Sequence, residues 1–535
     1  MKRKCKRLML IGLVVLVAFG SLTVFQALAQ TERERTLIVT YPFEPSQIDP
    51  HAYSEAEVNI LMWGVYESLY VYGSDGSLVP VLATSYTVSE DGKTYTFVLR
   101  EGVKFHTGED FNANAVKWNV ERQMGLNLGP ARYVTDFVES VEVVDKYIIA
   151  FHLKQPTPGY VLLLTGNWGL KFVSPGAVEE HKTADDPWAH EWFRDHMSGT
   201  GPYKFISYEH GQHIVVEKFD DYWGGWEGRH FDKIIERIVP ESSTQRLLLE
   251  RGDIDLTCMP LELEDIKALQ ANPSITVTAE PTVLIFIISV KTVDVGTTGP
   301  IMSNPKVRQA LAYAFNYDAV IDDIMGIKGS RISDMLFDPA FEGYDPDHFV
   351  YTYDLEKAKE LLVEAGYPNG GFRLDLMWLA VFPEYPRIAQ MYQADLAKLG
   401  ITLAIHGEPP ATFIDRIAKP ETTPDLVLRP RAPSNAHSFD WIHGWTKSMW
   451  PPTAYNEGYY TNPAFEVLYE AATGEIDDLK RAELVRQAAR IASEEVPVIW
   501  IAAVNDVMCH TSALQGIVHS PWYMYTLWPY DLYRE

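Results

Sequence analysis

Only one segment of this chain is apolar enough to span a membrane, and it lies at the N-terminus. Five basic residues precede an uncharged run from Leu8 to Phe25. Ala27-Leu28-Ala29 then places small residues at the two positions that a signal peptidase reads. An apolar run of about eighteen residues is also long enough for an uncleaved anchor, but Gly12 and Gly20 weaken it. We therefore predict that residues 1–29 are a cleavable signal peptide and that the protein is exported to a periplasmic or other extracytoplasmic space.

The rest of the chain, roughly 500 residues, is too long for a single hydrophobic core, so we expect two or three lobes. The sequence has 72 acidic and 46 basic residues, and removal of the N-terminal basic cluster would leave 41 basic residues. A protein with this excess of negative charge repels phosphate backbones and anionic lipids, so we expect no nucleic-acid partner. The same charge also keeps a large exported protein soluble, which is the interpretation that we favour.

Cysteine is rare in the chain. Cys5 belongs to the signal segment, and no cysteine closely follows the apolar run, which argues against a lipid-anchored protein. Cys258 and Cys509 remain after processing, and a disulfide between them is possible outside the cytoplasm. Two cysteines do not make a disulfide scaffold, however, and buried free thiols are the alternative.

Strand and helix patterns alternate along the whole chain, without low-complexity linkers or short repeats. Apolar residues near helical spacing predict helices over residues 56–70, 242–251, 305–315, 354–365 and 477–494. Asp354 is placed to cap the fourth of these helices and Gly366 to end it. Residues 37–41 and 498–504 have the composition of strands, and Asp91-Gly92 between two further strands predicts a tight hairpin. The chain is therefore predicted to be a mixed α/β protein.

The motifs that would suggest catalysis or a cofactor fail on their spacing. Gly92-Lys93-Thr94 has the last residues of a phosphate-binding loop, but position 87 is threonine where that loop needs glycine. His190 and His196 are six residues apart, whereas zinc helices present histidines at i and i+4, so we interpret this segment as a solvated amphipathic helix. The Gly-x-Ser-x-Gly motif of serine hydrolases does not occur. We expect a protein that is not an enzyme and that needs no metal or cofactor.

Five separated segments, taken together, resemble one known family. They are residues 78–113, Gly199-Thr-Gly-Pro-Tyr-Lys-Phe205, Pro305-Lys-Val-Arg-Gln-Ala-Leu-Ala-Tyr-Ala-Phe315, residues 353–368 and Gly458-Tyr-Tyr-Thr-Asn-Pro463. Their order and spacing resemble the large solute-binding proteins, family 5, that serve oligopeptide, dipeptide, nickel and some oligosaccharide ABC importers. The resemblance extends over nearly the whole mature chain.

The resemblance implies a two-lobed periplasmic-binding-protein fold, similar to type II, with an additional family-specific domain. The first lobe would comprise residues 30–77, 196–288 and 505–535, the extra domain residues 78–195, and the second lobe residues 289–504. The chain would pass between the lobes near Ile288-Ser289 and Ala503-Val504, and both Cys258 and Cys509 would belong to the first lobe. In this family the lobes close over the solute on a hinge, and the closed form docks on the membrane permease subunits of an importer.

The resemblance also indicates where a ligand would bind. In peptide-binding relatives, a segment that follows a strand of the second lobe carries an aspartate for the α-amino group of the peptide, because a buried ammonium needs such a partner. Residues 425–441 correspond to this segment, but the family's tryptophan and Asp-x-x-Asp-Pro pattern are missing from it. It holds Arg429, Arg431 and Asn435 instead, and only Asp440 remains as a substitute for the aspartate. Two arginines suit a carboxylate, a phosphate or a sugar hydroxyl better than an ammonium.

Aromatic residues and the end of the first strand supply the other candidates for ligand binding. Tryptophans of the second lobe could stack on sugar rings, although core packing is the commoner role of a tryptophan. Residues just after the first strand lie where the first lobe of this family often faces the cleft. These candidates are Tyr41, Glu44, Trp378, Trp441, Trp445, Trp450 and Trp500.

Three functions remain open at this stage. Family frequency alone favours a monomeric binding protein that captures a peptide for an ABC importer. The two arginines and the tryptophans favour the same role for an oligosaccharide or another non-peptide solute, whereas His437 and His443 are weak support for a metal complex. A hydrolytic or chaperone-like surface protein on the same fold is the third hypothesis.

Overall fold

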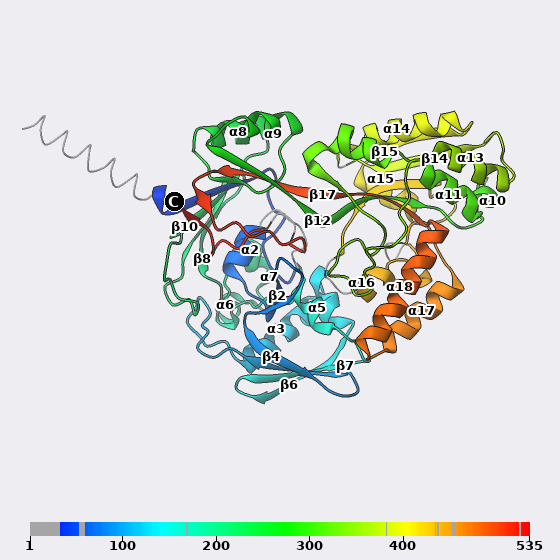
Figure 1. Cartoon of the computed structure of the whole chain (residues 1–535). Coiled ribbons are helices and arrows are strands. Elements are labelled where there is room, and N and C mark those ends of the chain that lie inside the picture. Colours follow the sequence, from blue (N-terminus) through cyan, green and yellow to red (C-terminus); the bar gives the residue numbers. More distant parts are fainter. Residues whose placement is uncertain are drawn as a thin grey trace, which may run out of the picture.

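The structure is a computed structural model that describes residues 33–52, 59–166, 169–296, 298–380, 382–433, 435, 438–451, 456–523 and 526–535. The predicted signal peptide, residues 1–29, lies outside the described residues, and so its cleavage stays a prediction. Within the described ranges, no helix has both the length and the hydropathy that crossing a bilayer requires. Figure 1 shows two large bodies joined by two long strands, with a third body of strands and helices below them.

One sheet of eleven strands runs through both large bodies (Figure 1). Its strands follow the order β15-β14-β16-β12-β17-β11-β1-β10-β9-β8, and β13 pairs with β17 beside this path. Their bounds are β1 Thr36–Tyr41, β8 Tyr203–Glu209, β9 His213–Lys218, β10 Lys233–Ile238, β11 Leu256–Thr257, β12 Ile275–Val290, β13 Gly329–Arg331, β14 Arg373–Leu379, β15 Thr402–Glu408, β16 Leu426–Arg431 and β17 Val498–Thr511. Parallel pairs such as β1–β10 and β14–β16 alternate in sequence with helices, as in α/β folds.

Two antiparallel strands, β12 and β17, take part in both halves of this sheet. The first half of β12 pairs with the end of β17, up to Pro281 opposite Asn505. The pairing is then interrupted and resumes with Ile285 opposite Ala503. Beyond this point β12 also pairs with β16 on its other side. The two strands therefore form the double connection between the large bodies.

The interruption marks where we infer that the chain passes between lobes. Proline has no N–H for a ladder hydrogen bond, and at this place the Thr282 hydroxyl donates to the carbonyl of Val504 over 2.7 Å. The predicted crossing at Ala503-Val504 coincides with the interruption. Ile288, at the other predicted crossing, pairs with Leu428 of β16 in the second half of the sheet, and both crossings stay predictions.

The first large body packs helices and loops on both faces of its part of the sheet. Helices α8, Ser242–Glu250, and α9, Leu263–Gln270, cover one face, and α9 lies against β12. A buried cluster with Leu249, Ile266 and Val507 fills this side. A second cluster, with Leu37 and Ile60, lies between the sheet and α2, Asn59–Val65.

The second large body carries most of the helices. They are α10 Gly299–Met302, α11 Pro305–Tyr313, α12 Tyr317–Ala319, α13 Leu355–Glu364, α14 Tyr385–Lys398, α15 Pro410–Ile417, α16 Ser438–His443, α17 Pro463–Gly474 and α18 Asp478–Glu495. The core under α11, α13 and α14 contains Leu311, Leu362 and Tyr392, together with Ile288 of β12. Helices α17 and α18 pack against each other on the other side (Figure 1).

The third body lies within the range that was predicted for the extra domain, and the bounds of that domain stay a prediction. Its antiparallel sheet has the order β4-β5-β7-β6. The strands are β4 Ala83–Val88, β5 Thr94–Leu99, β6 Val138–Asp145 and β7 Ile148–Leu153, and the helices are α3 Ala113–Leu126, α4 Arg132–Thr135, α5 Tyr160–Thr165, α6 Pro175–His181 and α7 His190–Phe193. Two short strand pairs complete the fold, β2 Tyr70–Tyr72 with β3 Leu78–Pro80 and β18 Leu514–Gln515 with β19 Tyr533–Arg534.

Several local predictions are confirmed. The Asp91-Gly92 turn joins β4 to β5, and Gly92 adopts a positive φ of 68°. Asp354 caps α13 by accepting a hydrogen bond from the backbone N–H of Lys357, and Gly366 follows the helix with φ 90°. The helix predicted over residues 56–70 is wrong at its end, because α2 stops at Val65 and Tyr70 already belongs to β2.

Cys258 and Cys509 are both free, buried thiols. Cys509 lies directly opposite Thr257 in the pairing of β17 with β11. Side chains alternate between the faces of a sheet, so Cys258 points to the face opposite Cys509. The two belong to different buried clusters, on either side of the sheet. The alternative of two buried thiols is therefore the one that the structure adopts, and the disulfide is not formed.

We predict that neither thiol reacts with iodoacetamide in the folded protein. Burial raises the pKa of both groups, that of Cys509 to about 12, so almost no thiolate is present at neutral pH. After unfolding in guanidinium chloride without a reductant, mass spectrometry of the mature chain should show two alkylated cysteines. Alkylation that requires prior reduction would reveal a disulfide and contradict this assignment.

Candidate ligand-binding site

A cluster of buried aromatic residues lies where the two large bodies meet. It combines Trp63, Tyr72, Trp522 and Tyr523 from the first body and the adjoining strands with Phe341, Trp441, Trp445 and Trp500 from the second. We call these eight residues the interlobe aromatic cluster. The ring centroids of Phe341 and Trp522 are 5.3 Å apart, so the contact crosses from one body to the other.

The tryptophans predicted to stack on sugars pack on one another in this cluster. The centroids of Trp441 and Trp445 are 4.7 Å apart, and those of Trp445 and Trp500 are 5.5 Å apart. The indole N–H of Trp441 donates to the carbonyl of Met335 over 2.6 Å. All three are at least nine-tenths buried. Core packing, the commoner role, therefore accounts for their positions.

Arg429 and Arg431, both predicted to bind ligand, face one buried carboxylate. Glu457 has no exposed side-chain surface and lies 3.5 Å from Arg429 and 3.9 Å from Arg431. The hydroxyl of Ser289 also donates to Glu457, over 2.8 Å. The guanidinium of Arg431 lies 4.0 Å from the ring centroid of Trp445, within the packed interior. Arg429 keeps 18% of its side chain exposed, more than twice the 7% of Arg431.

The other predicted site residues are spread over the molecule. Tyr41 is fully buried in the core of the first body. Glu44 is at the surface and accepts hydrogen bonds from the N–H of Gly211 and from the side chains of His210 and Tyr208. These contacts lower the pKa of Glu44 and tie it to the β8–β9 hairpin.

The remaining residues that were predicted to bind ligand are Trp378, Trp450, Asn435 and Asp440. Trp378 packs on the second-body core and over Gly407, its partner in the β14–β15 register, where a Cβ atom would clash with the indole nitrogen. The indole N–H of Trp450 donates to the carbonyl of Tyr460 over 3.0 Å. Asn435 is buried. Asp440 lies in α16, but its side chain is outside the described part of the structure, as is all of His437.

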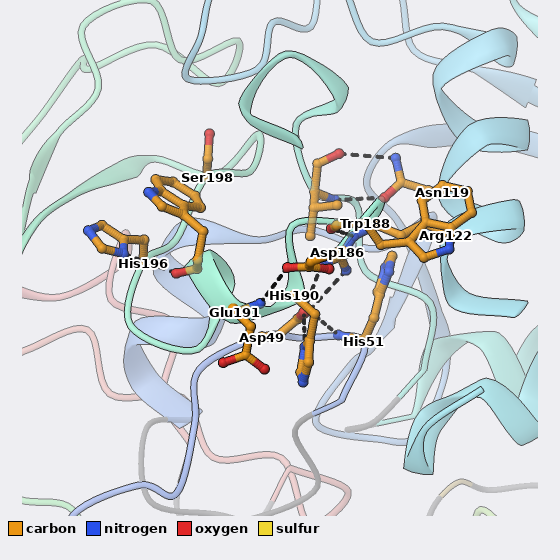
Figure 2. Close-up of polar contacts among 12 residues, drawn as sticks. Asp49, His51, Asn119, Arg122, Asp186, Trp188, His190, Glu191, His196 and Ser198 are labelled. Atoms are coloured by element: carbon orange, nitrogen blue, oxygen red, sulfur yellow. Dashed lines mark hydrogen bonds and ion pairs between the residues drawn. The ribbon is translucent and has the colours of Figure 1, made fainter. Parts of the chain in front are cut away.

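Figure 2 shows a buried polar network at the junction of the first body and the extra domain. Arg122 of α3 holds Asp49 with two hydrogen bonds, of 3.0 and 2.7 Å, and neither side chain has exposed surface. Nδ1 of His190 lies 2.9 Å from the same carboxylate. Burial raises the pKa of Asp49, but the charge of Arg122 and the hydrogen bond from His190 outweigh it, and the pKa lies well below its usual range.

The segment with His190 and His196 is not the solvated helix that the sequence suggested. Helix α7 spans four residues, and His190 at its start is largely buried against Asp49. His196 lies on another side, with Nδ1 3.0 Å from the carbonyl of Trp192 (Figure 2). The described residues contain no group of three or more metal-ligating side chains close enough to hold an ion.

The network connects to the interlobe aromatic cluster through Lys171, which the sequence did not single out. Nε2 of His51, next to Asp49, lies 2.8 Å from the carbonyl of Lys171. The Lys171 ammonium lies 4.1 Å from the ring centroid of Trp63. Burial lowers the pKa of His51 to about 4 and that of Lys171 to about 7. The sequence signal that could have identified Lys171 as a buried lysine is its place between apolar residues in Gly169-Leu-Lys-Phe-Val173.

A family model for the bacterial extracellular solute-binding proteins, family 5 (middle region), matches residues 77–466. The chain belongs to this family. The match includes all of residues 78–288 and most of the second body, and it confirms the resemblance drawn from the five sequence segments.

The similarity to individual proteins covers nearly the whole of this chain. The glutathione-binding protein GsiB of Pectobacterium atrosepticum is 29% identical over 482 residues, which are 89% of this chain and 90% of that protein. The structure of HbpA2 from Haemophilus parasuis has a TM-score of 0.80 at 26% identity and covers 94% of this chain and 100% of its own. The structure of the ABC transporter-associated periplasmic binding protein DppA from Helicobacter pylori, in complex with the peptide STSA, has a TM-score of 0.75 at 27% identity and covers 95% of this chain and 100% of its own.

These likenesses confirm the predicted fold class and the general function. The chain has the α/β architecture of periplasmic binding proteins, with the extra domain of family 5, and it is a solute-binding protein. Members of the family are substrate-binding proteins, not enzymes.

We predict that Asp49→Asn destabilises the fold strongly. The substitution leaves the Arg122 guanidinium buried without its charged partner, and breaking a buried ion pair from one side typically costs about 3–5 kcal/mol of unfolding free energy. Differential scanning calorimetry should show a lowered melting temperature for the unit that contains the extra domain. Asp220→Asn removes the same charge from a side chain that is 91% exposed and should melt like the wild type. An Asp49→Asn protein with an unchanged melting temperature would contradict the role of this pair.

We predict a similar loss for Glu457→Gln in the second body. The change removes the charge that two arginines share, and the cost should again be about 3 kcal/mol or more because Glu457 is fully buried. Urea unfolding followed by tryptophan fluorescence should detect it, since Trp445 packs on Arg431. Glu470→Gln, an exposed position on α17, is the matched control. Equal midpoints for the two variants would show that Glu457 does not hold the arginines.

Proposed function

We propose that the protein captures short peptides outside the cytoplasmic membrane and delivers them to the permease subunits of an ABC importer. The observation that carries the ligand class is the similarity, over about nine-tenths of the chain, to one protein named for glutathione and to another solved with the peptide STSA. Both ligands are short peptides. Export through the N-terminal signal segment and a monomeric state are part of the proposal.

Capture would work by closure of the two lobes around the double connection of β12 and β17. A ligand shifts an open–closed equilibrium only by the difference between its affinities for the two states. A peptide held between the lobes contacts both of them in the closed state alone, so its binding energy favours closure. The ladder interruption at Pro281–Ile285 provides a place where φ and ψ can change with few hydrogen bonds to break.

The charges near the lobe interface suit a zwitterionic ligand. Lys171 lies on the first-body side, over Trp63, and Arg429 lies on the second-body side with part of its surface exposed. A peptide carboxylate at Arg429 would meet a partly exposed cation. At Lys171 a carboxylate would favour the protonated amine, whose pKa burial lowers to about 7. Asp440, in α16, remains our candidate for the ammonium group of the ligand.

The structure weakens the case for an oligosaccharide ligand. That hypothesis depended on Trp441, Trp445 and Trp500 as stacking platforms, and these rings pack against one another. No observation in the described residues favours a hydrolytic or chaperone-like activity over binding. We therefore retain the peptide hypothesis as the function that the evidence supports best.

We predict that di- to pentapeptides raise the melting temperature of the mature protein, produced from residue 30 onward. A ligand at about a thousand times its dissociation constant stabilises the folded state by roughly 4 kcal/mol, which a thermal-shift assay detects. Glutathione and Ser-Thr-Ser-Ala should be the first probes, and β-linked oligosaccharides and nickel serve as controls of other ligand classes. A shift with oligosaccharides and none with peptides would replace the peptide assignment.

Lys171→Met and Arg429→Met should weaken peptide binding in isothermal titration calorimetry.

A further inference from the structure

A cavity of about 680 Å³ lies between the extra domain and the second body, outside the residues that the sequence assigned to ligand binding. One wall is formed by Tyr86 of β4, Tyr95 of β5 and Leu162 of α5, and the opposite wall by Glu342, Asp478 and Arg481. Its volume falls within the range of about 300–1,000 Å³ that is typical of small-molecule sites.

This cavity is adjacent to the lobe interface. Leu78, Leu162 and Ala340 line it and also pack against the larger buried cluster to which the interlobe aromatic cluster belongs. Ser438, the first residue of α16, lines it from the segment in which peptide-binding relatives carry the aspartate for the ligand's ammonium. A ligand that lies between the lobes near α16 can therefore extend into the cavity.

The Ser438 hydroxyl is a buried polar group with no hydrogen-bond partner. The residue is only 2% exposed. Burial of an unpartnered hydroxyl is unfavourable, and such groups are rare in native proteins unless a ligand or a water molecule satisfies them. Because Ser438 is among the residues that line the cavity, a polar group of a ligand held there is a candidate partner for this hydroxyl.

The second-body wall carries an excess of negative charge. Arg481 lies 2.8 Å from Glu342 and 2.6 Å from Asp478, so one guanidinium faces two carboxylates. Glu90, on the turn between β4 and β5, adds a third carboxylate from the extra domain. Burial and then the charge of Asp478 raise the pKa of the Tyr86 phenol, whereas the charge of Arg481 acts in the opposite direction on the pKa of Tyr95.

The extra-domain wall is aromatic and apolar. The rings of Tyr86 and Tyr95 are stacked with centroids 6.2 Å apart, and Leu162 lies beside them in the lining. Aromatic faces attract cations, and apolar walls suit the methylene stem of a long basic side chain. An aromatic wall opposite surplus carboxylates is the surface that such a side chain requires.

We propose that this cavity is a subsite for a lysine or arginine side chain of the bound peptide, between the tyrosines of the extra domain and Asp478 and Glu342 of the second body. This inference rests on the proposed peptide-binding function and extends it to ligand specificity. The subsite needs both walls, so a basic side chain bound there contacts the extra domain and the second body together.

The test compares tripeptides that differ only in charge at one position. Isothermal titration calorimetry of the full mature protein would use Ala-Ala-Ala backgrounds with lysine, norleucine or glutamate at each of the three positions in turn. Norleucine keeps the aliphatic stem of lysine and lacks the ammonium. At one position the lysine peptide should bind about tenfold more tightly than the norleucine peptide, and the glutamate peptide should bind least.

Variants then assign the preference to this cavity. Asp478→Asn should reduce the lysine-over-norleucine preference to about twofold, and Glu90→Gln, on the opposite wall, should reduce it in the same direction. Glu483→Gln, an equal charge change on the exposed face of the same helix, should leave the preference unchanged. Circular dichroism would confirm that each variant is folded.

The outcomes separate the subsite from the function on which it rests. Binding of tripeptides with no lysine preference at any position overturns the subsite and leaves peptide capture intact. A lysine preference that Asp478→Asn and Glu90→Gln do not change also overturns it, because the cation must then bind elsewhere. If no tripeptide binds at all, the proposed function fails and the subsite fails with it.

Discussion

The antiparallel ladder between β12 and β17 is the constraint on which the rest of the structure depends. It lies inside the eleven-stranded sheet, between β16 on one side and β11 on the other, and each end of it belongs to a different body. A continuous ladder of this length resists bending within its plane, because bending would break backbone hydrogen bonds that have no replacement in a buried strand. The gap between Pro281 and Ile285 is where this cost is smallest, since proline offers no N–H and the Thr282 side chain already substitutes for the ladder. The two bodies therefore share a sheet, and the hinge that we propose would act at this gap, next to a second register shift between Phe286 and Ile287.

Two kinds of contact surround this connection: buried ion pairs within the bodies, and aromatic contacts between them. The Asp49–Arg122 pair is fully buried and bidentate, and it links the first body to α3 of the extra domain. Glu457 plays a corresponding part in the second body, where it holds Arg429 and Arg431 beside β12. Contacts between the units are of another kind, mainly aromatic rings and the walls of a cavity. Ring contacts are less directional than buried ion pairs and can be remade in a second orientation, which is what a closing interface requires.

Local signals in the sequence predicted local structure well. The hairpin at Asp91-Gly92 and the cap at Asp354 are correct because turn and cap preferences depend on a few neighbouring residues. The family segments gave the architecture, since their order reflects the whole chain. The roles of individual side chains were harder to predict. Arg431 and Trp445 face each other only because the segment that follows α16 lies against β16. Cys258 and Cys509 are separated by the alternation of faces across paired strands, which depends on a register that no single segment reveals. Asp49 and Arg122, 73 positions apart, gave no pattern at all.

Ligand specificity and lobe closure depend on the same contacts in the mechanism that we propose. A group that binds one body only adds equally to the affinity of the open and closed states and does not drive closure. The cavity beside α16 has one wall on the extra domain, which is fixed to the first body through Asp49 and Arg122, and one wall on the second body. A cation between Tyr86 and Asp478 is therefore attracted by both units at once, and its binding energy appears almost entirely in the closed state. Side-chain recognition at such a place selects the ligand and favours the closed form through one set of contacts, so the ligands that fit best are also those that close the lobes most completely.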